Sequence, residues 1–135
     1  MLIEIKNVDE LVIYSSSKHD NIKDVVEEAV ANNVSLRLAN LEGVDLSNAN
    51  LQYARLGYAN LKNANLERAD LGNANLELVD LERSDMYGAD LSYANLHGSC
   101  LEGSNLRDAN LMYTDLRWAN LKMIDLSAAN STYVS

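Results

Sequence analysis

Leucine recurs at every fifth position of this chain from residue 36 to residue 126, with one interruption by the equally apolar Met86. Two residues before each of these positions stands a small or β-branched residue, most often alanine. The residue directly before it is almost always Asn or Asp. Residues 34–130 are therefore an A-(N/D)-L-x-x repeat that recurs about nineteen times.

A period of five fits neither the 3.6-residue period of a helix nor the two-residue period of a strand. A chain that turns a corner after every five residues does place all the leucines on one side. Four such sides close one coil, with the leucine and the small residue of each side pointing inward. Successive coils then stack roughly 4.8 Å apart through β-type hydrogen bonds. One coil cannot bury its leucines alone, so the stacking of neighbours supplies the stability.

This repeat resembles the pentapeptide-repeat family, and the resemblance covers about three quarters of the chain. It implies an all-β fold, a right-handed quadrilateral parallel β-helix, with about five coils over residues 34–130. Residues 131–135 follow the last leucine side, and we expect them to form a short C-terminal tail. The pattern is specific for the fold but says little about the function, because fold and function are separable.

The first 33 residues lack the repeat and predict a small cap. Residues 2–6 and 11–14 are rich in β-formers and predict a hairpin. Residues 21–31 predict a helix with Asp20 as its N-cap and an amphipathic pattern of apolar residues. A cap would cover the leucine-lined end and the unpaired backbone of the first coil. A separate binding domain is the alternative, but no recognition motif supports it.

Composition limits the classes of partner and compartment. The net charge of −9 argues against direct binding to nucleic acid or to an anionic membrane. No run of about 18 apolar residues is present, and the single cysteine fits a reducing compartment, so we expect a cytoplasmic protein. The chain has no proline, which suits an uninterrupted backbone ladder.

The outward positions two residues after each leucine form columns, because residues twenty apart lie above one another. One column, here the tyrosine column, holds Tyr53, Asn73, Tyr93, Tyr113 and Tyr133. Another, here the apolar column, holds Leu38, Tyr58, Leu78, Gly98 and Trp118. The two columns flank the side that carries Leu36, Leu56 and their equivalents. Stacked tyrosines either stabilise the ladder or form a contact surface for a partner.

Candidate catalytic and metal-binding residues are few. His97 and Cys100 are predicted to face different sides of the coil, and two ligands do not make a metal site. Carboxylates on a convex surface lack the cleft that acid–base catalysis needs. We therefore expect no enzyme activity, no metal and no cofactor.

The sequence favours a non-catalytic scaffold for protein–protein interaction, with a partner that it does not name. The family resemblance implies an alternative, a DNA-mimicking protein that binds DNA gyrase. Residues 36–135 hold thirteen acidic and eight basic residues, a net charge of 8 − 13 = −5. B-DNA carries about one charge per 1.7 Å, or roughly three per coil spacing, so this surface is a poor copy of it.

The last side in the pattern carries Leu126, and the coil that contains it has no leucines beyond it to cover it. Such an end exposes leucines and unpaired backbone groups, which favour association. We expect a homodimer that joins end to end by two-fold symmetry. The residues predicted at the junction are Leu121, Leu126, Tyr133 and Val134.

Overall fold

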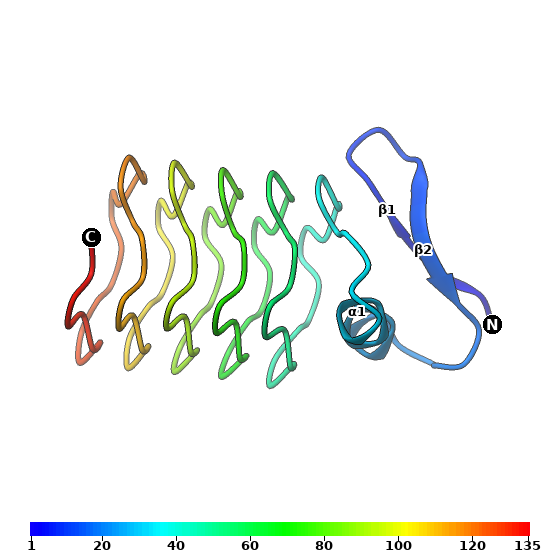
Figure 1. Cartoon of the computed structure of the whole chain (residues 1–135), viewed down its shortest axis with the longest axis horizontal. Coiled ribbons are helices and arrows are strands. Elements are labelled where there is room, and N and C mark those ends of the chain that lie inside the picture. The colour runs from blue at the N-terminus through cyan, green and yellow to red at the C-terminus, as the bar shows by residue number, and fades with distance from the viewer.

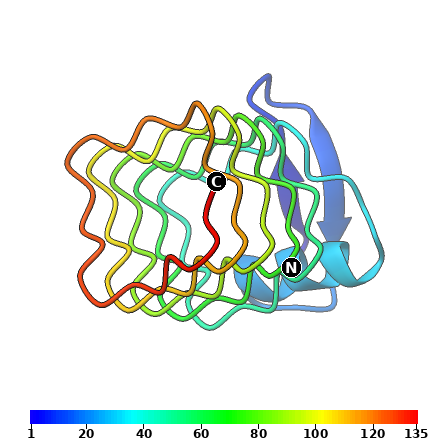
Figure 2. The same cartoon turned by 60° about the vertical axis from the view of Figure 1, so that its left-hand side comes forward.

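The computed structural model describes all of residues 1–135 and has two parts in line (Figure 1). A hairpin and a helix from the N-terminal segment lie at one end of a row of stacked coils. The chain then winds away from them, one coil after another, to the C-terminus at the opposite end. Figure 2 shows the coils nearly along their axis, where each lies over the one before it.

Successive coils are joined by a parallel backbone ladder between residues twenty apart. Its bridges run without a gap from Asn40 paired with Asn60 to Asn110 paired with Asn130. The Leu41 N–H donates to the Asn60 carbonyl at 2.8 Å, and the Asn60 N–H donates back to the Ala39 carbonyl at 2.8 Å. The predicted stacking of five-residue sides is confirmed.

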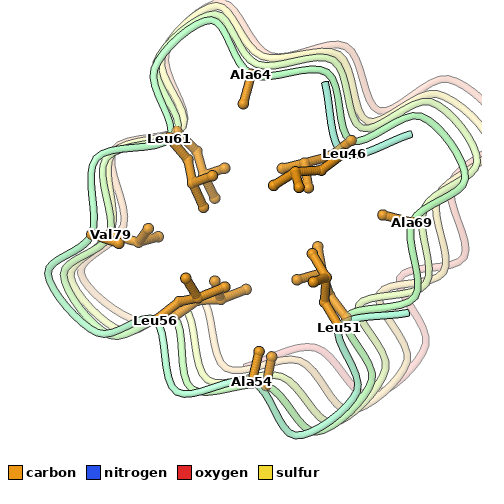
Figure 3. Packing of buried hydrophobic residues seen from close by; sticks show 14 of the residues in the cluster. Leu46, Leu51, Ala54, Leu56, Leu61, Ala64, Ala69 and Val79 are labelled. Atoms are coloured by element: carbon orange, nitrogen blue, oxygen red, sulfur yellow. The ribbon is translucent and has the colours of Figure 1, made fainter. Parts of the chain in front are cut away.

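The interior of the coils is filled by the leucines and the small residues. Figure 3 shows Leu46, Leu51, Leu56 and Leu61 pointing inward from four sides of the coil, with alanine or valine between them. All leucine positions from 36 to 111, Met86 among them, are at most 1% exposed. The inward and outward assignment made from the period of five is therefore correct for these coils.

The corners are four-residue turns that sequence analysis did not describe. In nearly all of them, the small residue donates its N–H to the carbonyl of the inward residue three positions earlier, as Ala39 does to Leu36 at 3.0 Å. The residue two after the leucine has a positive φ, 61° at Tyr53 and 56° at Asn63. A positive φ at the third residue of a turn is the mark of type II geometry.

The Asn or Asp before each leucine also has a structural task. The Asp45 Oδ1 accepts a hydrogen bond from the Ser47 N–H at 2.9 Å, and the same bond recurs along the chain. This Asx turn satisfies the backbone N–H that follows the leucine, which the ladder leaves unpaired. The repeat therefore requires an Asn or Asp oxygen there for local bonding rather than for charge.

The N-terminal segment consists of β1 (Ile3–Lys6), β2 (Val12–Ser16) and α1 (Ile22–Ala31). β1 and β2 pair antiparallel, with an irregularity in register between Ile5 and Lys6. The predicted hairpin and helix are thus present. The predicted N-cap was wrong: Asn21, not Asp20, is the cap, because the Asn21 side chain accepts from the N–H of Asp24.

The N-terminal segment packs directly on the first coil. Ile5, Val25, Val26 and Ala29 are buried in the same apolar cluster as the coil leucines. The backbone ladder continues into the hairpin as well, since Asn40 donates its N–H to the Lys6 carbonyl at 2.8 Å. Apolar packing and backbone pairing therefore both cover this end of the coils.

Residues 131–135 continue the repeat rather than forming a tail. The Leu116 N–H donates to the Ser135 carbonyl at 2.9 Å, and the Ser135 N–H donates to the Thr114 carbonyl at 3.1 Å. Val134 is half-buried and packs against the core. The backbone ladder holds these five residues in place although their inward position carries Ser131 instead of leucine.

Candidate interaction surfaces

The tyrosine column contains a continuous aromatic stack at its C-terminal end. The rings of Tyr93 and Tyr113 lie 4.9 Å apart at 15°, and those of Tyr113 and Tyr133 lie 4.8 Å apart at 10°. All three side chains are exposed. Tyr53 is exposed too but stands alone, because Asn73 occupies the coil between it and Tyr93. The structure therefore brings together three of the four tyrosines of this column.

The apolar column is less regular. Arg37 lies over the ring of Tyr58, with its guanidinium carbon 4.0 Å from the ring centroid. Leu78 leans over Gly98, where a Cβ would come within 2.8 Å of the Leu78 Cδ2. Trp118 is 85% exposed and packs on no other aromatic ring. The column is therefore a set of separate apolar patches along one corner.

Bulky residues in both columns occupy a strained backbone conformation. Tyr93, Tyr113 and Trp118 have φ between 59° and 64°. Glycine and asparagine are the residues that adopt this region at least cost, and a bulky residue there costs of the order of 1 kcal/mol. Asn73 shows that the same column accepts asparagine. Stacking between the rings offsets part of this cost for Tyr93 and Tyr113.

The C-terminal coil has an open backbone edge. The N–H groups of Trp118, Leu121, Met123 and Leu126 have no hydrogen-bond acceptor, whereas their equivalents in earlier coils donate to the next coil. Leu121 and Leu126 are 38% and 40% exposed, in contrast to the fully buried leucines of the middle coils. Tyr133 is exposed and Val134 half-buried beside this edge. The four residues predicted at the junction all belong to this last coil.

Five of the eight basic residues of the coils lie in ion pairs. Arg117 makes two hydrogen bonds to Asp115, at 2.9 and 2.7 Å. These bonds, with the Arg117 N–H as a further donor, lower the pKa of Asp115 to about 2. Lys62 lies 3.2 Å from Glu82 and 3.4 Å from Asp80, and this pairing raises the pKa of Lys62. Basic residues, most of them in ion pairs, therefore interrupt the negative charge of this surface, which forms no continuous line.

The N-terminal segment holds a small cluster around Glu28. The Tyr14 hydroxyl donates to Glu28 at 2.6 Å, Ser16 donates to the same carboxylate at 3.1 Å, and His19 Nε2 lies 2.5 Å from it. The hydrogen bond from Tyr14 lowers the pKa of Glu28, and the contacts from His19 and Ser16 act in the same direction. These bonds tie β2 and the loop after it to α1, so we assign the cluster to holding the N-terminal segment together.

Cys100 is half-buried, and its Sγ lies 3.9 Å from the amide nitrogen of Asn120.

Sequence analysis did not single out Arg37 and Arg55, which line one hollow with Ser35, Gly57 and Asn75. The sequence signal that could have pointed to this hollow is that residues 35 and 55, each directly before a leucine, are not the usual Asn or Asp.

A family model described as pentapeptide repeats matches eight copies of the repeat, over residues 27–57, 59–92, 69–108 and 89–127. The match spans well over half of the chain. This chain belongs to the pentapeptide-repeat family. The coils described above are thus the right-handed β-helix that pentapeptide-repeat proteins form.

Solved pentapeptide-repeat proteins resemble the chain over about 70% of its length. One from the thylakoid lumen of Arabidopsis thaliana is 27% identical, covers 71% of this chain and 63% of its own, and has a TM-score of 0.57. One from the cyanobacterium Cyanothece is 31% identical, with coverage of 70% and 65% and a TM-score of 0.41. HetL from the cyanobacterium Nostoc, which takes part in regulating heterocyst differentiation, is 31% identical, with coverage of 71% and 50% and a TM-score of 0.32.

The chain spans between half and two thirds of the length of these three pentapeptide-repeat structures. A search of curated protein sequences finds no significant match. None of the helices is both long and apolar enough to pass through a bilayer.

Proposed function

We propose that this pentapeptide-repeat protein is a non-catalytic β-helical scaffold that binds a protein partner along the side between the tyrosine and apolar columns. The observation that supports this most directly is the exposed stack of Tyr93, Tyr113 and Tyr133 on backbone that favours glycine or asparagine. Tyrosine and tryptophan are the side chains that protein interfaces favour. Trp118 across the same side extends the apolar contact area.

Replacing Tyr93 and Tyr113 together by asparagine tests this surface. Asparagine keeps the turn, as Asn73 does in the same column, so stability should change by no more than about 2 kcal/mol from lost stacking. Capture of a specific partner from cell lysate should fall at least about tenfold. The change is measured by quantitative pull-down beside thermal unfolding of the same samples.

Arg83→Asn is the matched control for that variant, because Arg83 occupies the same turn position on another corner. Its partner capture should equal that of the unmodified protein. Unchanged capture by the double tyrosine variant, together with a large drop in melting temperature, would assign the tyrosine stack a purely structural role and refute the interface.

Binding to DNA gyrase remains the alternative, and a supercoiling assay with purified gyrase separates it from the scaffold function. The charge pattern supports the scaffold: five of the eight basic residues beyond residue 36 lie in ion pairs, interspersed among the acidic ones. Inhibition of supercoiling, or protection of gyrase from its inhibitors, would favour the alternative instead.

We further propose that two copies join end to end through the C-terminal coil. The open edge offers both unpaired donors, such as the Leu121 N–H, and unpaired acceptors, such as the Ala119 and Ala129 carbonyls. An edge with both kinds of group can pair with itself across a two-fold axis. The exposed Leu121 and Leu126 side chains would be buried at the same junction.

Changing Leu121 and Leu126 to serine should convert the dimer to a monomer, as measured by light scattering. The tyrosine variant described above serves as the control and should stay dimeric. A monomeric unmodified protein would contradict this proposal. So would a dimer that survives the leucine changes but separates in the tyrosine variant, because the side of the helix would then be the interface.

A further inference from the structure

A polar hollow of about 150 Å³ lies on the first coils, on the side between the two columns. Ser35, Arg37, Arg55, Gly57 and Asn75 line it, and none of these is apolar. They come from three successive coils, since residues 35, 55 and 75 lie above one another. The hollow is thus built by the stacking itself and not by a loop.

The two arginines of this hollow are the arginines without a carboxylate partner. The other four each lie within 4.0 Å of an Asp or Glu. No carboxylate comes that close to Arg37 or Arg55, even though Glu77 is only one coil away on the same side. Arg37 is held instead over the ring of Tyr58, and its Nη1 reaches toward Gly57. In a chain of net charge −9, two guanidinium groups without a carboxylate partner line this hollow.

The same hollow contains a backbone donor whose usual acceptor is missing. On most sides the N–H after the leucine donates to an Asn or Asp oxygen, as the Glu77 N–H does to Asn75 at 3.0 Å. The Glu102 N–H, which follows Cys100 and Leu101, is another exception. Arg55 stands where that acceptor should be, and the Gly57 N–H has no hydrogen-bond partner. One coil earlier Ser35 fills the position and accepts only a long bond of 3.4 Å from the Arg37 N–H.

Gly57 keeps the floor of the hollow open. A Cβ at this residue would lie 3.8 Å from the Arg37 Nη1 and 3.7 Å from the Glu77 carbonyl oxygen. Any longer side chain would project into the space between the arginines. Gly57 itself is buried, so its unpaired N–H is a costly group to leave without an acceptor.

We propose that this hollow binds a phosphate group, with one oxygen taking the place of the absent Asx oxygen. That oxygen accepts from the Gly57 N–H, and Arg37 and Arg55 donate to the others from both sides. The Ser35 hydroxyl and the Asn75 amide are further donors at the rim. A carboxylate needs only one guanidinium for a bidentate pair, whereas two guanidinium groups with additional neutral donors match a doubly charged group with three free oxygens.

Nuclear magnetic resonance titration of the full chain with inorganic phosphate tests the site. The measurement is made at about pH 8, where inorganic phosphate is mostly the doubly charged ion, and at constant ionic strength. The amide resonance of Gly57 should shift saturably. Acetate, as a carboxylate probe, should shift it at least about tenfold less at equal concentration. Phosphoserine and adenosine monophosphate then identify whether an amino-acid or a nucleotide ester fits better.

Arg55→Asn is the decisive variant, because it restores the residue that the repeat prefers. The asparagine side chain that this change introduces should accept from the Gly57 N–H, so the protein should unfold at the same or a higher temperature. Phosphate affinity should nevertheless fall at least about tenfold. Arg83→Asn removes the same charge from an ion-paired arginine that lies outside the hollow, and it should leave phosphate binding unchanged.

The site is refuted if Gly57 shows no saturable shift with phosphate, or if Arg55→Asn and the unmodified protein bind it equally well. Equal binding of acetate and phosphate would overturn the assignment to phosphate. None of these outcomes depends on the tyrosine column, so the phosphate site and the partner-binding surface can fail separately.

Discussion

The Leu76→Ala variant is expected to lose about 2–5 kcal/mol of its free energy of unfolding. Leu76 is fully buried in a middle coil, and the coils above and below it fix the backbone around the space that its side chain fills. The ladder bond from the Leu76 N–H to the Asn95 carbonyl, 2.7 Å long, holds that side of the square in place. Because the walls cannot collapse, most of the volume removed would remain as a cavity.

Leu78→Ala is the matched control, since it makes the same chemical change two residues away. Leu78 lies at the corner and is 42% exposed, so its truncation should cost less than about 1 kcal/mol. Chemical denaturation of both variants and the parent measures the difference. Equal losses would mean that the buried and exposed positions of the repeat had been assigned wrongly.

Deletion of residues 1–33 is expected to have the largest effect, because the truncated protein should aggregate. The deletion removes Val25, Val26 and Ala29 from contact with the first leucines and exposes that apolar surface to water. It also frees the Asn40 N–H, which donates to Lys6 in the intact chain. An open edge with an apolar face next to it is a template for association.

Two point variants separate loss of packing from loss of chain length. Val26→Asp introduces a charge at a fully buried site between α1 and the coils, and it should reproduce the aggregation of the deletion. Val12→Asp makes the same change at a residue of β2 that is 49% exposed, and it should behave like the parent. Light scattering and melting temperature distinguish them. A truncated protein with the same association state and the same melting temperature as the parent would show that residues 1–33 are no cap.

The fold could be predicted because its information is local and repeated. Each side needs one inward leucine, one inward small residue and one Asx turn, and the sequence supplies all three at a spacing of five. No other regular structure places residues at that spacing on one face. The helix could be predicted for a similar reason, from the spacing of Val25, Val26 and Ala29, although its N-cap could not. Asp20 and Asn21 have equally suitable side chains, and only the backbone geometry selects Asn21.

The position of the columns could likewise be predicted, but not the contacts within them. Tyr93, Tyr113 and Tyr133 stack because the coil spacing of roughly 4.8 Å equals the distance at which offset rings pack. Trp118 gains no such partner, because the column position one coil before it is Gly98, which has no side chain. Leu78, one coil further back, packs against that glycine. Which side chain leans on which depends on rotamers that the spacing of the repeat does not fix.

By itself, then, the sequence determined which residues point inward and the order of the outward columns, because a period of five fits neither a helix nor a strand and the repeat resembles that of a family with a four-sided coil. The tertiary structure alone decided which polar groups remain unpaired. That Arg37 and Arg55 lack a carboxylate partner, while the other four arginines have one, follows from distances between side chains in the folded coils. Hydrogen bonds and ion pairs form or fail within a few tenths of an ångström, and no pattern along the chain encodes separations that fine.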